Sequence, residues 1–234
     1  GQAFVPVPDD RAQHREQLVQ YYAAVTAIDE QVGVIVDELE RTGQLHNTLI
    51  VYTSDHGHMC GHHGLWCKGN ATTPQNFFDE SILVPCLLSW LGALPQGQVQ
   101  DAVVDHCDLF ATLLEAAGAE QPGEINSPGR SYLPLLAGNT NQWAKTAQVC
   151  EYGNARMVRT DHYKLIRRYA SNGHCYPDEF YDLHADSREM INRIGDAPIG
   201  HMSWQEDFHA WQEDVIQAKI PLIVNSSRGV GRSS

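Results

Sequence analysis

The chain has no apolar stretch that approaches the roughly 18 residues a membrane-spanning helix requires. It is also poor in basic residues, because 16 Lys and Arg stand against 29 Asp and Glu, giving a formal net charge of −13. Binding to a nucleic-acid backbone normally needs a basic face, and this charge balance argues against one. We therefore expect neither a membrane nor a nucleic acid among the partners of this chain.

The cysteines form neither a C-x-x-C pair nor a dense framework, although the chain has six of them. Sequence alone therefore assigns no disulfide connectivity. Cys86 and Cys150 lie in apolar, strand-like runs, which predicts buried free thiols at both positions. Internal repeats and low-complexity tracts are absent as well, and a hydrophobic content of 42% is typical of a folded globular protein.

The N-terminal part of the chain predicts a helix followed at once by a buried strand. Residues 11–42 carry apolar side chains at steps of three and four, with Asp10 suited to cap the helix and Gly43 to end it. The apolar run 48–53 follows, and this order is typical of a parallel sheet. The residues expected to face the core are Leu18, Tyr22, Val25, Ile28, Val32, Ile35, Val36 and Leu39.

The remaining pattern predicts an α/β fold in two parts, residues 1–154 and residues 155–234. Beyond residue 155 the apolar runs become short and turns separate them, which favours a small antiparallel sheet. The first part is expected to belong to a larger mixed sheet flanked by helices. The further predicted helices cover 75–81, 105–117 and 204–218, and the further predicted strands cover 84–90, 147–151, 157–159, 163–168 and 179–183.

A glycine-rich loop over residues 53–70 carries most of the chemistry. Asp55 and His56 emerge together where the strand 48–53 ends, and Lys68 closes the same loop. Oxygen and nitrogen donors at the carboxyl end of a strand can hold a divalent cation. A lysine nearby adds a positive charge that could meet an anionic substrate group.

Two other interpretations of this loop stay open. Asp-His-Gly can simply form a turn in which Asp55 caps nearby amides, and a single lysine is commonly solvated. The loop also has enough soft donors for a zinc or copper site, although their spacing fits no standard zinc finger. Those donors are His56, His58, Cys60, His62, His63 and Cys67.

The loop resembles that of the sulfatases of the alkaline-phosphatase superfamily. In that family Ser-Asp-His/Asn-Gly is followed by Gly-x-His-Gly-Leu-Trp and a lysine, as in 54–57, 61–66 and Lys68 here. The resemblance implies an alkaline-phosphatase-like mixed sheet, with 1–154 as the C-terminal portion of the catalytic domain and 155–234 as the closing subdomain, a small antiparallel sheet with a helix. Further matching segments are 21–55, 68–72, 79–85, 105–109, 112–118, 156–164 and 180–183.

The resemblance also implies roles for single residues. Asp55 and His56 would be metal ligands, with Ca²⁺ the usual ion and Mn²⁺ left open, because nitrogen is a less typical ligand for a hard cation. Lys68 would contact the sulfate and neutralise its charge. His63 would line the pocket or protonate a leaving group, with a structural role as the alternative. His58 and His62 depart from the acidic residues usual at their positions.

The family's nucleophile is a formylglycine made within a Cys/Ser-x-Pro/Ala-x-Arg motif, and none of the six cysteines has proline two residues on together with arginine four residues on. The resemblance therefore implies that this chain is the C-terminal half of a sulfatase, inactive alone, whose partner is the N-terminal half of the same enzyme. The expected substrate is a sulfate ester, with a sulfated sugar in view. A phosphonate or phosphate ester hydrolase and a non-catalytic truncated chain are the alternatives.

Assembly and location are less constrained by the residues. If strands of the sheet are absent, the apolar face left exposed could be covered by another copy, which would make a homo-oligomer. Localisation stays open, since the resemblance favours a periplasmic or secreted enzyme and a cytoplasmic location is compatible with the same residues.

Overall fold

The computed structural model of the chain describes residues 2–3, 5–120, 127, 129–170 and 173–195. These residues belong to two compact units, Gly1–Gln98 and Val99–Ser234. The predicted helix over 204–218 lies outside the described residues. The elements are β1 (Gln2–Ala3), α1 (Arg11–Arg41), β2 (Ile50–Thr53), β3 (Thr72–Thr73), α2 (Asp79–Ile82), β4 (Cys86–Ser89), α3 (His106–Ala116), α4 (Leu133–Leu136), β5 (Gln148–Tyr152), β6 (Ala155–Arg159), β7 (Tyr163–Arg168) and β8 (Glu179–Asp182).

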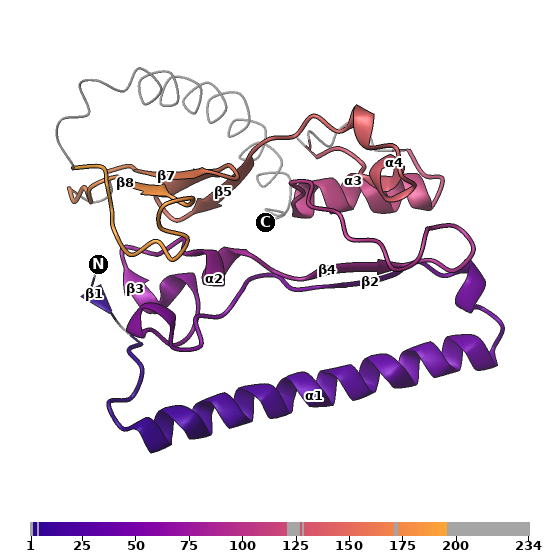
Figure 1. The fold of residues 1–234 in the computed structure, drawn as a ribbon, viewed down its shortest axis with the longest axis horizontal. Helices are drawn as coiled ribbons and strands as arrows, with labels where there is room; N and C mark the ends of the chain where they lie inside the picture. The colour runs from indigo at the N-terminus through magenta and orange to yellow at the C-terminus, as the bar shows by residue number, and fades with distance from the viewer. Residues whose placement is uncertain (1, 4, 121–126, 128, 171–172, 196–234) are drawn as a thin grey trace, which may run out of the picture. The chain divides into compact units, whose positions relative to one another are not determined.

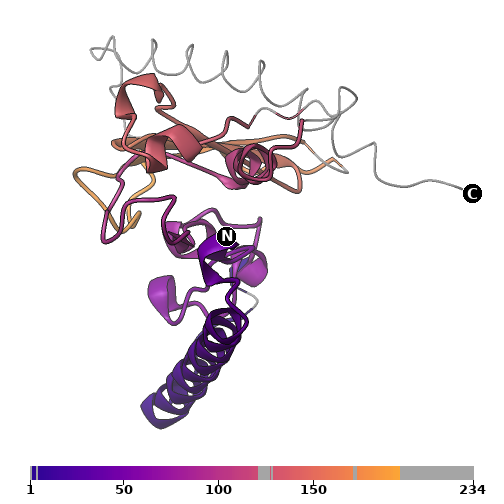
Figure 2. The same ribbon diagram turned by 90° about the vertical axis from the view of Figure 1, so that its right-hand side faces the viewer.

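The long N-terminal helix is confirmed, and α1 runs without interruption (Figures 1 and 2). Asp10 caps it as predicted, since its Oδ1 accepts a hydrogen bond of 2.8 Å from the amide of Ala12. Gly43 follows its end with a φ of 71°, a left-handed conformation that favours glycine. No helix in the described part of the chain is long and apolar enough to cross a membrane.

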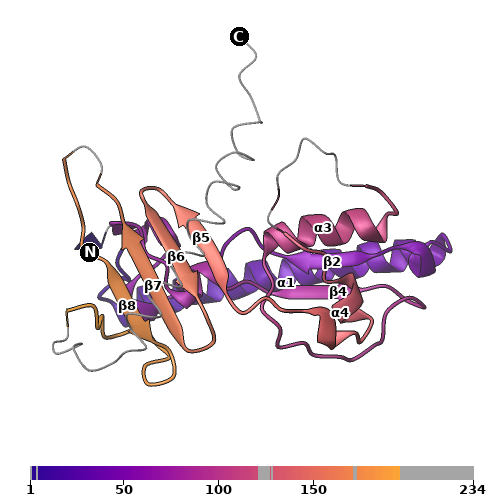
Figure 3. The same ribbon diagram turned by 90° about the horizontal axis from the view of Figure 1, so that it is seen from above.

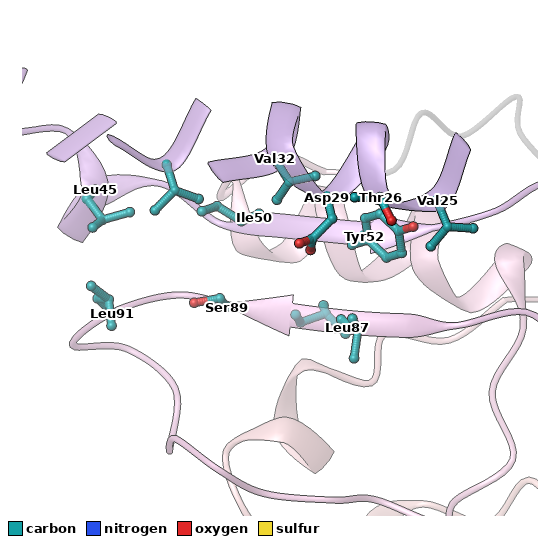
Figure 4. Close-up of a pocket in the computed structure, with 12 residues that line it drawn as sticks. Val25, Thr26, Asp29, Val32, Leu45, Ile50, Tyr52, Leu87, Ser89 and Leu91 are labelled. Carbon is teal, nitrogen blue, oxygen red and sulfur yellow. The ribbon is translucent and has the colours of Figure 1, made fainter. Parts of the chain in front are cut away.

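The apolar face of α1 is not buried, which corrects the expectation that it faces a core. The helix contains no fully buried residue, and Tyr22, Ile28 and Ile35 are each more than half exposed. Its C-terminal part lies over β2 and β4 across a cavity of about 590 Å³ (Figure 4). The lining is mainly apolar and includes Val25, Val32, Ile50 and Leu87. The exposed apolar face predicted for the sheet itself stays a prediction.

The strands β2 and β4 pair antiparallel, with Ile50 opposite Ser89 and Thr53 opposite Cys86, so the predicted parallel arrangement is wrong for this pair. A parallel connection must carry the chain back along the sheet, usually through a crossover helix. The residues between these strands instead fold beside the end of β2, where the amide of Gly57 binds the carbonyl of Ser81 at 2.9 Å. The chain therefore re-enters the sheet from the same end. Cys86 is exposed, contrary to expectation.

The second unit contains the predicted small antiparallel sheet, in the order β5-β6-β7-β8 (Figure 3). Its first hairpin pairs Tyr152 with Ala155, so the division predicted between residues 154 and 155 falls inside one sheet. The assignment of the two parts to a catalytic domain and a closing subdomain stays a prediction. In the same unit Lys164 and Glu189 form an ion pair at 2.5 Å, and both side chains are almost fully buried.

Candidate functional site

The structure brings Asp55, His56 and Lys68 together just past the end of β2. The Nζ of Lys68 lies 2.6 Å from the Nε2 of His56, although twelve residues separate them. The Oδ2 of Asp55 lies 3.5 Å from the same Nε2. The Asp55 side chain is 83% exposed, whereas that of His56 is 38% exposed. The loop therefore presents a carboxylate, an imidazole and an ammonium group at one accessible point.

The hydrogen bonds of His56 define its tautomer. A lysine ammonium group can only donate, so the Nε2 of His56 must accept from Lys68. The carbonyl of Gly57 can only accept, so the Nδ1 of His56 carries the proton and donates to it at 2.9 Å. The lone pair on Nε2 therefore accepts from the Lys68 ammonium group, which would have to move aside before Nε2 could bind a metal. The tautomer itself, with Nδ1 held by a carbonyl, is the one in which an imidazole binds a metal.

The Asp55 and His56 side chains fit part of a metal site. Metal–ligand bonds of roughly 2.0 to 2.6 Å place two adjacent ligand atoms about 3 to 3.6 Å apart. The 3.5 Å between Asp55 Oδ2 and His56 Nε2 is within that range. In the described ranges, however, no group of three or more His, Cys, Asp and Glu side chains could hold a metal ion. A hard cation would need further oxygen ligands from elsewhere.

His63 belongs to a second group, built around Glu80 of α2. The Nδ1 of His62 lies 2.6 Å from Glu80 Oε1, and the Nε2 of His63 lies 3.8 Å from Glu80 Oε2. The His63 ring stacks on Phe78 with centroids 3.7 Å apart, and its side chain is 10% exposed. The contacts described for His63 are thus to α2 and its N-terminal neighbour. The sequence analysis did not identify Glu80 as a site residue. The only indication was that it is an acidic residue within the matching segment 79–85.

The donors of the alternative zinc site are spread over separate contacts. His58 packs between Tyr21 and Trp66, with ring centroids 5.2 and 4.9 Å away, and its Nδ1 lies 3.3 Å from the sulfur of Cys60. Burial lowers the pKa of His58. Burial also raises the pKa of the Cys60 thiol, and this raised pKa opposes formation of the thiolate that zinc requires. Cys67 instead lies 3.7 Å from the Oδ1 of Asn70. The described residues therefore contain no closed site of the predicted soft donors.

A small core and residues 5–7, near the start of the chain, hold the loop in shape. Met59 is fully buried and packs with Leu65 and Ala71. The amide of Val7 donates to the carbonyl of Gly64 at 3.0 Å, and the carbonyl of Val5 accepts from the amide of Trp66 at 2.8 Å. Residues 5–7 thus run alongside the loop, with an isolated antiparallel bridge between Pro6 and Leu65.

Two family models match this chain. A model of the sulfatase family matches residues 2–119, and a model of the C-terminal part of N-sulphoglucosamine sulphohydrolase matches residues 61–210. The two matches overlap across the loop that carries His63 and Lys68. Together they cover the described parts of both units.

Individual relatives are similar over most of this chain. N-acetylglucosamine-6-O-sulfatase of Bacteroides thetaiotaomicron is 34% identical over 199 residues, which are 79% of this chain and 33% of that protein. The multifunctional alkaline phosphatase superfamily protein PehA of Trinickia caryophylli is 29% identical over 209 residues, which are 80% of this chain and 38% of that protein. The chain thus spans about a third of the length of these curated relatives.

One solved structure extends the similarity to the fold. It contains a protein in complex with its substrate D-glucosamine-2-N,6-O-disulfate and superimposes with a TM-score of 0.74 at 30% identity. The superposition covers 88% of this chain and 41% of that one. The predicted α/β fold of the alkaline-phosphatase-like type is therefore confirmed, and so is the resemblance on which it rested. The chain belongs to the sulfatase family.

Proposed function

We propose that this chain serves the hydrolysis of sulfate esters and supplies part of the catalytic site. The observation that carries the proposal is the meeting of Asp55, His56 and Lys68 at one end of β2, where the Nζ of Lys68 lies 2.6 Å and the Oδ2 of Asp55 lies 3.5 Å from the His56 Nε2. A carboxylate and an unprotonated imidazole nitrogen can hold a divalent cation. An ammonium group beside them can hold an anion such as sulfate.

Each residue has a distinct role in this proposal. Asp55 and His56 would hold the cation, Ca²⁺ or Mn²⁺, with the carbonyl of Gly57 keeping the imidazole in its ligand tautomer. When bound, the cation would polarise the sulfate oxygens as a Lewis acid. The Lys68 ammonium would neutralise charge as the ester bond breaks. His63 would border the pocket, oriented by Glu80 and Phe78.

The nucleophile is expected to come from outside this chain. No cysteine stands in the formylglycine motif, and the chain spans about a third of its curated relatives. We infer that a segment carrying the formylglycine and further oxygen ligands completes the site. Without that segment, Asp55 and His56 lack the oxygen ligands that a hard cation prefers.

The substrate class proposed is a sulfated amino sugar. Support comes from the relative named N-acetylglucosamine-6-O-sulfatase and from the fold match that holds a glucosamine disulfate. A phosphate or phosphonate ester stays the second candidate, and a relative named as a multifunctional alkaline phosphatase superfamily protein is compatible with it. An Asp-His metal pair could serve either ester, so the identity of the nucleophile would separate the two.

The proposal can be tested first on the chain alone. With Ca²⁺ or Mn²⁺ present, we expect no release of nitrophenol from nitrophenyl sulfate above a buffer control, because the chain carries no nucleophile in the family motif. Metal-dependent turnover by the purified chain would contradict the proposal that the catalytic site is shared between this chain and another segment.

A sharper test uses an enzyme in which this chain is joined to a formylglycine-bearing segment. Asp55→Asn and His56→Ala should lower both activity and bound metal, because they remove ligands. Lys68→Ala should lower activity by about two to three orders of magnitude and leave the metal content unchanged. Asp101→Asn, at an exposed position outside the loop, is the matched control. Normal metal content in both ligand variants would refute the assignment.

A further inference from the structure

The site loop has two arms, residues 55–57 and residues 68–69, and buried hydrogen bonds of Ser81 and Asn76 join them. The first arm carries Asp55 and His56 and ends at Gly57, whose amide donates to the carbonyl of Ser81 at 2.9 Å. The hydroxyl of Ser81 donates to the Oδ1 of Asn76 at 2.7 Å. The Nδ2 of Asn76 then donates to the carbonyl of Lys68 at 3.3 Å. These bonds run from the residue after His56 to the backbone of Lys68.

The bonds lie where they cannot be exchanged easily for water. Ser81 is 3% exposed and Asn76 is 5% exposed. A buried polar group that loses its partner keeps the full cost of its desolvation, so these bonds constrain the structure strongly. Asn76 makes a second bond from its Nδ2 to the carbonyl of Gly69, and the amide of Asn76 donates to that same carbonyl at 2.9 Å. The second arm is therefore held at two successive residues.

The first arm is held as closely. A Cβ atom at Gly57 would stand 2.0 Å from the carbonyl oxygen of Glu80 and 3.1 Å from that of Leu83. The backbone of α2 is thus in direct contact with residue 57, and only glycine fits there without a shift.

We propose that Ser81 and Asn76 are positioning residues that fix the separation between His56 and Lys68. The hydrogen bonds behind the loop and the 2.6 Å contact between Lys68 Nζ and His56 Nε2 form a closed ring. Ser81 and Asn76 touch neither reacting group and act through the backbone of the loop. The functional meaning of this brace, as we call Ser81 and Asn76, rests on the proposed roles of His56 and Lys68.

The test measures the His56 imidazole in this chain by ¹⁵N NMR, at a pH above the range where histidine ionises. In the wild type, the signals should show one tautomer, with Nδ1 protonated and Nε2 bare. In Ser81→Ala, Asn76 loses the bond that ties it to Ser81, so the side-chain link between the two arms is broken. The imidazole should then lose this single-tautomer signature and average between both forms. The readout needs no turnover, so failure of sulfate hydrolysis and failure of the brace would be distinguishable.

A buried hydroxyl elsewhere provides the control. Thr112 is fully buried in the other unit, where its hydroxyl donates to the carbonyl of Asp108 at 2.7 Å and accepts from the amide of Tyr132 at 2.9 Å. Thr112→Val should reduce stability yet leave the His56 signals unchanged. Unchanged His56 signals in Ser81→Ala would overturn the proposal.

A measurement on the wild type keeps the proposal testable if Ser81→Ala does not fold. The amide of Gly57 should exchange with deuterium at least tenfold more slowly than the amide of exposed Gly97, because it is hydrogen-bonded against α2. Exchange of Gly57 as fast as that of Gly97 would show that the brace does not hold the first arm, and would refute the proposal.

Discussion

Replacing Gly57 by alanine should disrupt the contact between the site loop and α2. The added Cβ would stand 2.0 Å from the carbonyl oxygen of Glu80, and real Cβ contacts essentially never fall below 3.0 Å. The obstacle is backbone, so no side chain can rotate away, and the two segments must separate by about 1 Å. Overpacking of this kind typically costs about 1 to 3 kcal/mol. Loss of the bond from Gly57 to Ser81 would add about 1 kcal/mol.

Urea denaturation of the chain measures this cost as a fall of about 2 to 4 kcal/mol in the free energy of unfolding. Gly33→Ala is the matched control, because a Cβ there meets no atom within 4 Å. Gly33 lies inside α1, where alanine should raise stability by about 0.5 to 1 kcal/mol. In an enzyme with the complete site, a displacement of 1 Å could cost about a hundredfold in rate. Wild-type stability in Gly57→Ala would refute the close packing of α2 on this loop.

Two further predictions concern buried groups of the second unit and the accessibility of the thiols. Lys164→Met should lower the free energy of unfolding by about 3 to 5 kcal/mol, because Glu189 would lose the ammonium group that neutralises its buried charge. Adding Glu189→Leu should recover most of that loss, and a double variant as unstable as the single one would contradict this. Burial raises the pKa of the Cys150 thiol, so it should react with iodoacetamide more slowly than exposed Cys86 and Cys175. Peptide mapping by mass spectrometry would show the order, and early modification of Cys150 would count against its burial.

The sequence by itself determined the elements whose signals are local. The start and end of α1 follow from Asp10 and Gly43, because capping and left-handed conformations depend on neighbouring residues only. The helix predicted from Asp105 is observed as α3, with Asp105 and Asp108 in a capping box. The short strands of the second unit were also predicted, since alternation and turns act over a few residues.

The position of Asp55 and His56 was also readable, because both follow a strand directly. The family pattern predicted that they approach Lys68, but it did not predict the geometry of that contact. The tautomer of His56 depends on the carbonyl of Gly57 and on Lys68 together. No spacing rule gives those two contacts.

Only the tertiary structure decided how distant segments meet. The antiparallel pairing of β2 and β4 depends on where the loop between the strands folds, and the exposure of α1 depends on which segments pack against it. The contacts of Glu80 with two histidines, and the bonds of Ser81 with Asn76 and Gly57, join residues that look unremarkable in sequence. Hydrophobic periodicity indicates which side of a single helix or strand is buried. These contacts instead arise because the loop closes on itself and because every buried polar group needs a partner.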